Sequence, residues 1–416
     1  MFHLKKITNN SGDKLKILLI GYNGAANTGS EARLLATIED IRALLGQKAL
    51  VTVPTLFENN LRRYIQESPE LKIAPFNPIY FRDFYRLIKE NDLVLLIEGS
   101  CYMDTWSCFL FWAWLWATRC AYTMRKPVVA YAVDSGDLSR ANQKHLCRIA
   151  GKTNLIITRT RPAAERIKTW GVTAPLEVTA DTAFAFQTDP SDEGLLNRIW
   201  PEATTGIAGI AAVDFYRWPV VARLWGRKED CYRWPYYFSK SSERTRSSDA
   251  LAKGLAELAD DLVQKTNKSI ALICMEQLDE PMALKIKSRM TYGDRARIFS
   301  AREYNASQIT VILRSLDLLI TSRYHAGVLS LAAGVPQAAV GHDYRLADLY
   351  EELGIKDEFF INYQAPNLFT RLSDLVKRLI DEETVLRARL ETEYQKHLER
   401  ATGNRILLQN IFNSTL

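Results

Sequence analysis

The feature that most constrains the fold is a repeated alternation of short apolar runs with longer amphipathic segments. The runs Leu15–Ile20 (LKILLI) and Asp92–Ile97 (DLVLLI) have the length and composition of strands buried on both faces. Glycine-containing turns follow them, and helical patterns come next. Strands that alternate with helices are typical of βαβ units, so we expect parallel sheets.

The apolar runs fall into two series, separated by a polar, turn-rich stretch over residues 188–203. We therefore predict an α/β fold of two Rossmann-like domains that face each other across a cleft, over residues 1–187 and 204–367. Residues 368–416 read as helices that cross back to the first domain. The expected strands are Leu15–Ile20, Ala49–Val53, Asp92–Ile97, Pro127–Ala132, Asn154–Thr158, Leu176–Thr179, Gly206–Ala212, Ser269–Met275, Ala296–Ser300, Asp317–Thr321 and Gln337–Val340.

Composition excludes several classes of protein. The 416 residues carry 54 Lys and Arg against 48 Asp and Glu, a net charge of +6, which is too mild for a dedicated nucleic-acid binder. The five histidines and six cysteines show no metal-ligand spacing, so we expect no metal site. Reduced cysteines and a polar segment after Lys6 in place of a leader predict a cytoplasmic protein.

The stretch Cys108–Ala117 (CFLFWAWLWA) is the one strongly apolar run. It is too short to span a bilayer, which takes about 20 apolar residues. A buried helix beside a sheet is the favoured interpretation. The alternative is a surface in which Trp112, Trp114 and Trp116 touch the inner face of a membrane.

The loop over residues 21–31 (GYNGAANTGSE) joins the first strand to a helix. Thr28 and Glu31 form a T-x-x-E pattern, which predicts a capping box and a helix start near Thr28. A helix N-terminus attracts anions, but Glu31 in the first turn would repel a phosphate. The loop therefore suits a hydroxyl-bearing ligand, with Asn27 and Glu31 as hydrogen-bonding groups. A purely structural glycine turn is the alternative.

The stretch over residues 317–345 places an arginine and a histidine where a strand ends and a helix begins. We expect a strand to Thr321, a helix from about Tyr324 to Ala333 and a helix stop at Gly334. Ligands of parallel sheets bind at this edge. Arg323 offers a fork for carboxylate or phosphate, and a phosphate would favour the charged form of His325. The alternative is a structural ion pair and a helix cap.

These segments together resemble the polysaccharide pyruvyl transferase family. The opening motif of that family is matched by Gly21-Tyr22-Asn23-Gly24-Ala25-Ala26-Asn27-Thr28-Gly29-Ser30-Glu31, and its late motif by Ser322-Arg323-Tyr324-His325-Ala326 with Gly334-Val335-Pro336. Residues 92–100, 157–172 and 179–184 are similar to intervening segments. Ser30, Glu98-Gly99-Ser100 and Tyr324 depart from the family pattern.

The resemblance implies a glycosyltransferase-B-like fold and phosphoenolpyruvate as donor, with no cofactor and no metal. The acceptor would be a sugar of a polysaccharide or a lipid-linked oligosaccharide, which gains pyruvate as a cyclic ketal. The implied donor-binding residues are Arg217, Arg323, Tyr324 and His325. The implied acceptor-binding residues are Asn27, Gly29, Glu31 and Glu98.

The residues suit this chemistry. Phosphoenolpyruvate has a phosphate and a carboxylate, so two arginines are appropriate. His325 is expected to act as the acid or to activate the phosphate, and Glu31 or Asp181 is expected to take the hydroxyl proton. A nucleotide-sugar glycosyltransferase of the same architecture and a non-catalytic glycan-binding relative are the competing functions. The acceptor and the oligomeric state stay open.

Residues 214–254 interleave nine aromatic side chains with arginine and lysine. Such a stretch can bind sugars on aromatic faces and anions on arginine, and it can equally bind nucleic acid. The alternative without a ligand is an inserted surface loop whose aromatic side chains pack on the domain. Residues 217–254 hold nine Lys and Arg against four Asp and Glu, close to the excess of the whole chain. Residues 239–249 (SKSSERTRSSD) read as a mobile segment, which suggests a lid over the cleft.

Overall fold

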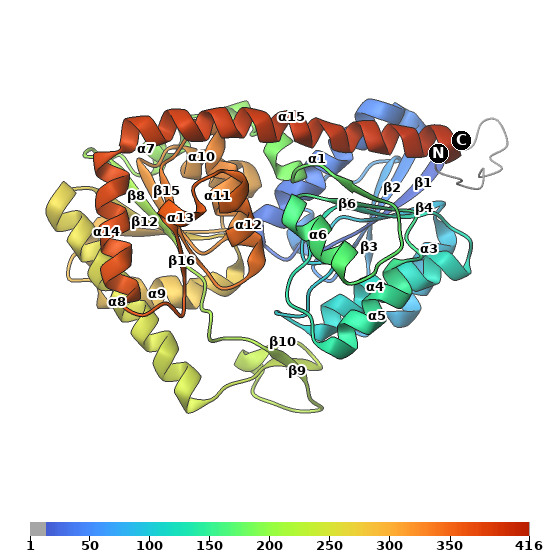
Figure 1. Ribbon diagram of the computed structural model, residues 1–416, viewed down its shortest axis with the longest axis horizontal. Coiled ribbons are helices and arrows are strands. Elements are labelled where there is room, and N and C mark those ends of the chain that lie inside the picture. Colours follow the sequence, from blue (N-terminus) through green and yellow to red (C-terminus); the bar gives the residue numbers. More distant parts are fainter. Residues whose placement is uncertain (1–13, 416) are drawn as a thin grey trace.

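Two parallel sheets organise the molecule, one in each half of the chain (Figure 1). The computed structural model describes residues 14–415. The first sheet has seven strands in the order β3-β2-β1-β4-β5-β6-β7, and every pairing is parallel. Its strands are Leu15–Ile20 (β1), Ala49–Thr55 (β2), Leu71–Pro75 (β3), Leu93–Leu96 (β4), Val128–Val133 (β5), Leu155–Thr158 (β6) and Leu176–Val178 (β7).

The second sheet repeats this order with six parallel strands, β13-β12-β8-β14-β15-β16. In both sheets the first strand in sequence is central, so the chain reverses its direction of winding beside it. Ligands of such sheets bind at this switch point, beyond the carboxyl ends of the strands. The strands are Ile207–Ala211 (β8), Ser269–Cys274 (β12), Ala296–Ser300 (β13), Leu318–Thr321 (β14), Gln337–Gly341 (β15) and Phe360–Asn362 (β16). The predicted fold of two Rossmann-like domains is confirmed.

Helices cover both faces of each sheet, and apolar side chains fill the layers between them. The strands are buried on both faces, which explains their uninterrupted apolar sequence. The helices are Thr28–Leu45 (α1), Glu58–Leu61 (α2), Phe81–Glu90 (α3), Cys108–Thr123 (α4), Arg140–Ala150 (α5), Arg161–Thr169 (α6), Leu195–Ile199 (α7), Ser242–Thr266 (α8), Glu280–Arg289 (α9), Ala306–Arg314 (α10), Tyr324–Ser330 (α11), Tyr344–Glu352 (α12), Lys356–Phe359 (α13), Leu368–Asp381 (α14) and Glu383–Thr415 (α15).

The 33-residue helix α15 runs along one side of both domains (Figure 1). Near its start, Leu386 and Leu390 belong to the apolar core of the second domain. Near its end, Leu408 and Phe412 belong to the core beside β1 and β2. One continuous helix therefore packs on both sheets.

A small three-stranded antiparallel sheet projects from the second domain between β8 and α8. We call residues 214–239 the flap. Its strands are Val220–Ala222 (β9), Cys231–Arg233 (β10) and Tyr236–Phe238 (β11). Trp218 stacks edge-on against Trp106 of the first domain, and the hydroxyl of Tyr236 donates to the carbonyl of Pro78. The flap thus bridges the two domains, opposite α15 (Figure 1).

The structure bears on three local expectations. Residues 242–249 are not a mobile segment but the first turns of α8, where Ser241 caps the helix through the amide of Arg244. Residues 214–239 form a sheet in place of an irregular loop. The favoured interpretation of the Cys108–Ala117 run is confirmed, because the run lies in the helix α4. Trp114 is buried, so the three tryptophans of the alternative do not share one exposed face.

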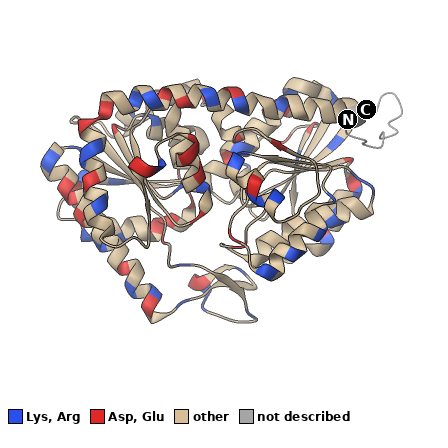
Figure 2. Ribbon diagram, viewed as in Figure 1, with Lys and Arg blue, Asp and Glu red and all other residues tan. Residues whose placement is uncertain are grey.

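Two further observations concern the surface and the chain end. In the described part of the chain, no helix is long and apolar enough to cross a membrane. Basic and acidic residues alternate along the outer helices of both domains (Figure 2). The prediction about a leader rests on residues 5–11, which lie outside the described residues.

Candidate active site between the two domains

A cavity of about 180 Å³ lies where the two domains and the flap meet. Each of the three parts supplies a different chemistry. The first domain contributes polar groups from the turns after β1 and β4, the second contributes charged groups from the turns after β12, β14 and β15, and the flap contributes aromatic rings. The polar lining includes Tyr22, Asn27, Ser30, Glu98, Ser100, Tyr232, Arg233, Glu276, Arg323, His325, Asp343 and Arg345.

Backbone hydrogen bonds join the turn after β1 to the turn after β12 across the domain boundary. The amide of Thr28 donates to the carbonyl of Met275 at 2.8 Å, and the amide of Gln277 donates to the carbonyl of Ala26 at 3.1 Å. Asn27 and Glu276 therefore form an isolated antiparallel bridge. The two ligand edges are held together by main-chain atoms.

The start of α1 is capped by Asn27 and not by the predicted capping box. The side-chain oxygen of Asn27 accepts from the amide of Ser30 at 3.1 Å, whereas the hydroxyl of Thr28 has no partner among the described residues. The helix nonetheless begins at Thr28, as predicted. Gly29 has a steric reason, because a Cβ there would lie 2.0 Å from Nδ1 of His325.

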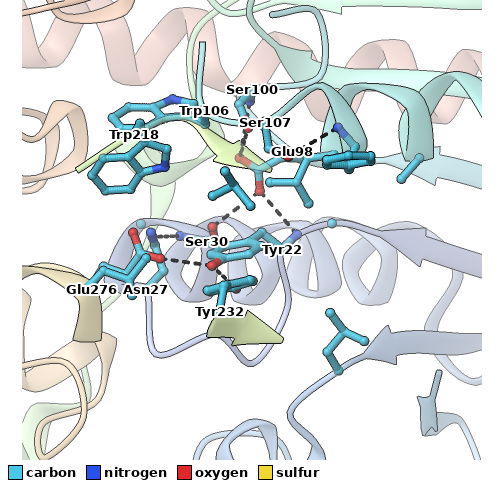
Figure 3. Close-up of a pocket in the computed structure, with 18 of the residues that line it drawn as sticks. Tyr22, Asn27, Ser30, Glu98, Ser100, Trp106, Ser107, Trp218, Tyr232 and Glu276 are labelled. Carbon is cyan, nitrogen blue, oxygen red and sulfur yellow. Dashed lines mark hydrogen bonds between the residues drawn. The ribbon is translucent and has the colours of Figure 1, made fainter. Parts of the chain in front are cut away.

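Glu98 is fixed in the cavity by groups of the first domain (Figure 3). Its Oε2 accepts from the amide of Tyr22 at 3.2 Å and from the hydroxyl of Ser30 at 3.4 Å. Its Oε1 accepts from the amide and hydroxyl of Ser100 at 3.2 and 3.1 Å. Four donors therefore fix the orientation of the carboxylate on the cavity wall.

Tyr22, Tyr232 and Glu276 meet at the point where the first domain, the flap and the second domain converge (Figure 3). The hydroxyl of Tyr22 contacts that of Tyr232 and donates to Oε1 of Glu276 at 3.0 Å. Burial raises the pKa of both Glu276 and Tyr22, and for Tyr22 the charge of Glu276 adds to the effect. Neutral hydroxyls and a carboxyl with raised proton affinity thus line this corner.

Arg323 lies on the cavity wall between two acids. Its guanidinium forms hydrogen bonds to Asp279, with Nε at 2.9 Å from Oδ2, and Nη2 is 3.2 Å from Oε2 of Glu276. Burial opposes its charge, but Asp279 and Glu276 raise the pKa of Arg323 above its ordinary value. Its Nη1 makes no hydrogen bond within residues 14–415. The arginine is thus held on one side and leaves one donor for an anion.

His325 lies deeper, against a buried ionic cluster of the first domain. Its Nε2 is 3.4 Å from Oδ2 of Asp181. Asp181 in turn bonds Arg159 at 2.6 Å and lies 3.6 Å from Arg33. Burial lowers the pKa of His325, against the pull of Asp181. The imidazole is therefore neutral near pH 7 unless an anion joins it.

Glycine at position 99 is required by this cluster. A Cβ there would lie 2.6 Å from Nη1 of Arg33 and 2.7 Å from Nη1 of Arg159. The guanidinium of Arg159 also lies 3.6 Å from the ring centroid of Tyr324. The turn after β4 therefore carries Glu98 into the cavity while its glycine rests on two buried arginines.

The sequence matches a known family over most of its length. The family model described as polysaccharide pyruvyl transferase covers residues 27–344. The chain belongs to this family. The matched range includes Asn27 and Gly29 of the glycine-rich loop and the Arg-x-His motif of Arg323 and His325.

One curated relative is the amylovoran biosynthesis protein AmsJ of Erwinia amylovora, to which this chain is 20% identical over 289 residues. The match covers 67% of this chain and 64% of that protein, so it spans somewhat less than two thirds of the relative.

Solved structures support the fold. The UDP-GlcNAc 2-epimerase of Neisseria meningitidis bound to UDP-GlcNAc superposes with a TM-score of 0.60 at 10% identity, over 96% of this chain and 100% of that one. The UDP-N-acetylglucosamine 2-epimerase from Listeria monocytogenes gives a TM-score of 0.60 at 13% identity, over 97% and 98% of the two chains. At such identities the likeness shows the arrangement of two Rossmann-like domains alone.

Most of the site residues predicted from the sequence lie on this cavity, and three do not. Those on its wall are Asn27, Gly29, Glu98, Arg323, Tyr324 and His325. Glu31 is buried behind the wall near Arg63 and the start of α10. Arg217 stacks on the outer side of Phe238 and donates to the carbonyl of Leu278. Asp181 reaches the cavity only through His325.

Several residues of the site were not predicted from the sequence. Glu276 and Asp279 directly follow the strand β12, so an acid after a strand at the ligand edge was an available signal. Tyr232 comes from the flap, where no periodic pattern marks its position. Across residues 14–415, no three metal-ligating side chains lie close enough together to hold an ion.

Proposed function

We propose that this protein transfers the pyruvyl group of phosphoenolpyruvate to a sugar of a polysaccharide or of its lipid-linked precursor, forms a cyclic ketal and releases phosphate. The observation that carries the proposal is the cavity itself. It sets Arg323 and His325 of the family motif opposite Glu98, across about 180 Å³ of space between the two ligand edges. The first wall carries Glu98 and hydroxyl groups, and the second carries Arg323 and Arg345, each paired with an acid of its own domain.

The walls suit the two substrates. The free Nη1 of Arg323 provides a donor for a carboxylate or a phosphate, and Arg233 on the same cavity adds a positive charge that no carboxylate pairs among the described residues. Arg345 also lines the cavity but is paired with Asp343. Glu98 and Asn27 provide acceptors for sugar hydroxyls. Aromatic rings of Trp106, Trp218 and Tyr232 offer faces for a sugar ring. The proposed donor side is the second domain, and the proposed acceptor side is the first.

The proposed reaction balances without a redox partner. The methylene carbon of phosphoenolpyruvate gains a proton, and a sugar hydroxyl attacks the adjacent carbon. Phosphate leaves, and a second hydroxyl of the same sugar closes the ketal. Of the two hydroxyl protons, one balances the proton on the methyl group and the other leaves with phosphate. His325 beside the bound anion would become charged and is the proposed proton donor.

Glu31, one of two predicted bases, is a poor choice on geometry because it does not reach the cavity. Glu98 lies on the cavity wall instead and is assigned to bind an acceptor hydroxyl. Asp181 acts through His325, whose orientation it fixes. Arg217, predicted to bind the donor, is assigned to supporting Phe238 of the flap. Cytoplasmic location remains a prediction.

The test is phosphate release from phosphoenolpyruvate by the purified full chain with a panel of saccharides and lipid-linked saccharides. We expect acceptor-dependent release, and an added mass of a pyruvate ketal on the acceptor. Arg323→Lys should reduce release, whereas the exposed Arg161→Lys should not. Failure of both release and phosphoenolpyruvate binding across the panel would overturn the proposal.

A nucleotide-sugar glycosyltransferase is the second candidate, because the similar solved structures include proteins bound to UDP or UDP-GlcNAc. Titration of the chain with UDP separates the two. Tight binding of UDP together with no binding of phosphoenolpyruvate would favour this candidate.

A further inference from the structure

Large apolar side chains are exposed on the flap, on the side of the molecule opposite α15. Leu224 is 73% exposed and Trp225 78% exposed, and Trp234 beside them is 55% exposed. The three lie at one end of the flap sheet, since Nε1 of Trp234 donates to the carbonyl of Leu224 at 3.1 Å. Exposed apolar side chains that lie together, unlike single ones, mark interaction sites.

A second exposed apolar group lies next to this end of the flap, at the start of α3. It consists of Ile79, Phe81 and Tyr85, which are about half exposed. The two groups are neighbours because the hydroxyl of Tyr236, two residues after Trp234, donates to the carbonyl of Pro78 at 3.1 Å. We call Leu224, Trp225, Trp234, Ile79, Phe81 and Tyr85 the docking surface.

Basic side chains accompany the docking surface. Arg223 and Lys228 flank Trp225, and Arg82 follows Phe81, and all three are exposed. Within the described residues, no carboxylate pairs with any of them. Aromatic side chains beside unpaired cations are the composition of proteins that rest at the headgroup level of an anionic bilayer.

The apolar wall of the cavity reaches the same place. Pro78, Tyr80 and Tyr236 line the cavity while they connect the flap to α3. Phe84 and Trp114 extend this wall inward. The docking surface therefore borders the apolar wall of the cavity.

We propose that the docking surface binds the face of an anionic lipid bilayer, so that the cavity opens toward the membrane. The surface differs from the tryptophan run suggested by the sequence, whose middle residue is buried. The proposal concerns binding alone and stands whether or not phosphoenolpyruvate is the donor.

The test is co-sedimentation of the full chain with phosphatidylcholine vesicles, with and without phosphatidylglycerol. We expect binding to the anionic vesicles only. Leu224→Ser/Trp225→Ser should weaken it by about tenfold or more, because buried apolar area sets such affinities. The matched control is Leu284→Ser/Val385→Ser, which removes side chains that are 60% and 75% exposed elsewhere and should bind as the wild type does.

Charge is tested separately with Arg223→Gln/Lys228→Gln, which should lower binding to anionic vesicles by about tenfold, since each basic residue near such a surface contributes independently. Wild-type protein that ignores anionic vesicles, or an equal loss in the matched control, would overturn the proposal. So would light scattering that shows an oligomer dissociated by Leu224→Ser/Trp225→Ser, because the surface would then join two copies of the chain.

Discussion

Two arginines each lie between acids near the domain boundary, and they differ in burial. Arg159 bonds Asp134 and Asp181 at 2.7 and 2.6 Å, and no part of the three side chains reaches solvent. Arg323 bonds Asp279 in the same manner, yet its side chain is 13% exposed and lines the cavity. The same pairing therefore occurs in a sealed setting and in an open one.

The buried cluster around Arg159 joins the two domains, whereas the cluster around Arg323 lines the cavity. Around Arg159, the first domain meets Tyr324 and His325 of the second. Around Arg323, both acids come from the second domain, and Asp279 holds the guanidinium in position at the edge of the cavity. The difference separates a residue needed for stability from one needed for a ligand.

Arg159→Met tests the sealed side and should have the largest effect. It leaves Asp134 and Asp181 buried without their partner, so we expect a loss of about 3–5 kcal/mol in the free energy of unfolding. Urea unfolding followed by circular dichroism measures it. The exposed Arg161→Met is the control and should change little. A loss as small as that of the control would show that the cluster is not stabilising.

Glu31→Gln tests another buried ionisable side chain. Burial raises the pKa of Glu31 from 4.5 to about 8, so the folded state binds a proton more tightly than the unfolded state does. The contribution of Glu31 to the free energy of unfolding is therefore greatest below about pH 4.5, and it is lost as the pH rises through 8. The glutamine does not titrate, so the variant should gain on the wild type, on the order of 3 kcal/mol, between pH 5 and 9. Urea midpoints at the two pH values give the comparison, and a constant difference would contradict it.

Arg323→Lys tests the open side. A lysine keeps the charge but loses the fork that bonds Asp279 and the ligand together. We expect kcat/KM for phosphoenolpyruvate to fall by about 10- to 100-fold, the loss of one charged hydrogen bond, with a smaller change in unfolding free energy than in Arg159→Met. An equal loss of stability in the two variants would remove the distinction between them.

Glu98→Gln should have the smallest effect of the four variants, and the effect should be on binding of the acceptor. The amide replaces one carboxylate oxygen by a donor facing Ser100 or Ser30, at a cost of about 1–2 kcal/mol in acceptor binding. The KM for the saccharide should rise while the KM for phosphoenolpyruvate stays within about twofold. Initial rates with each substrate varied in turn separate the two, and a rise confined to the donor would reverse the assignment of the walls.

Much of the fold could be predicted because buried parallel strands are written as apolar runs. Leu15–Ile20 and Ala296–Ser300 match the structure at both ends. Strands without such runs escaped, among them β3 at the edge of its sheet and the three-residue strands of the flap. Their pairing depends on contacts with distant segments, which a local pattern does not contain.

The site could be predicted where motif and topology agree. Arg323 and His325 follow a strand at the switch point, and both reach the cavity. Glu31 has the right position in sequence, but its side chain points to α10 because the helix begins with Asn27 as cap. Arg217 was predicted to bind the donor because it follows the first strand of the second domain. It lies in the flap, whose path through space cannot be read from the distance along the chain.

The main-chain bonds between the turn after β1 and the turn after β12 have a consequence for how this molecule can change over evolutionary time. Because Thr28, Ala26, Met275 and Gln277 meet through amides and carbonyls, replacing their side chains leaves the alignment of the two domains intact. Substitutions on the cavity wall, such as Ser30 or Glu98, can then alter which sugar is accepted without disturbing the frame that brings the substrates together.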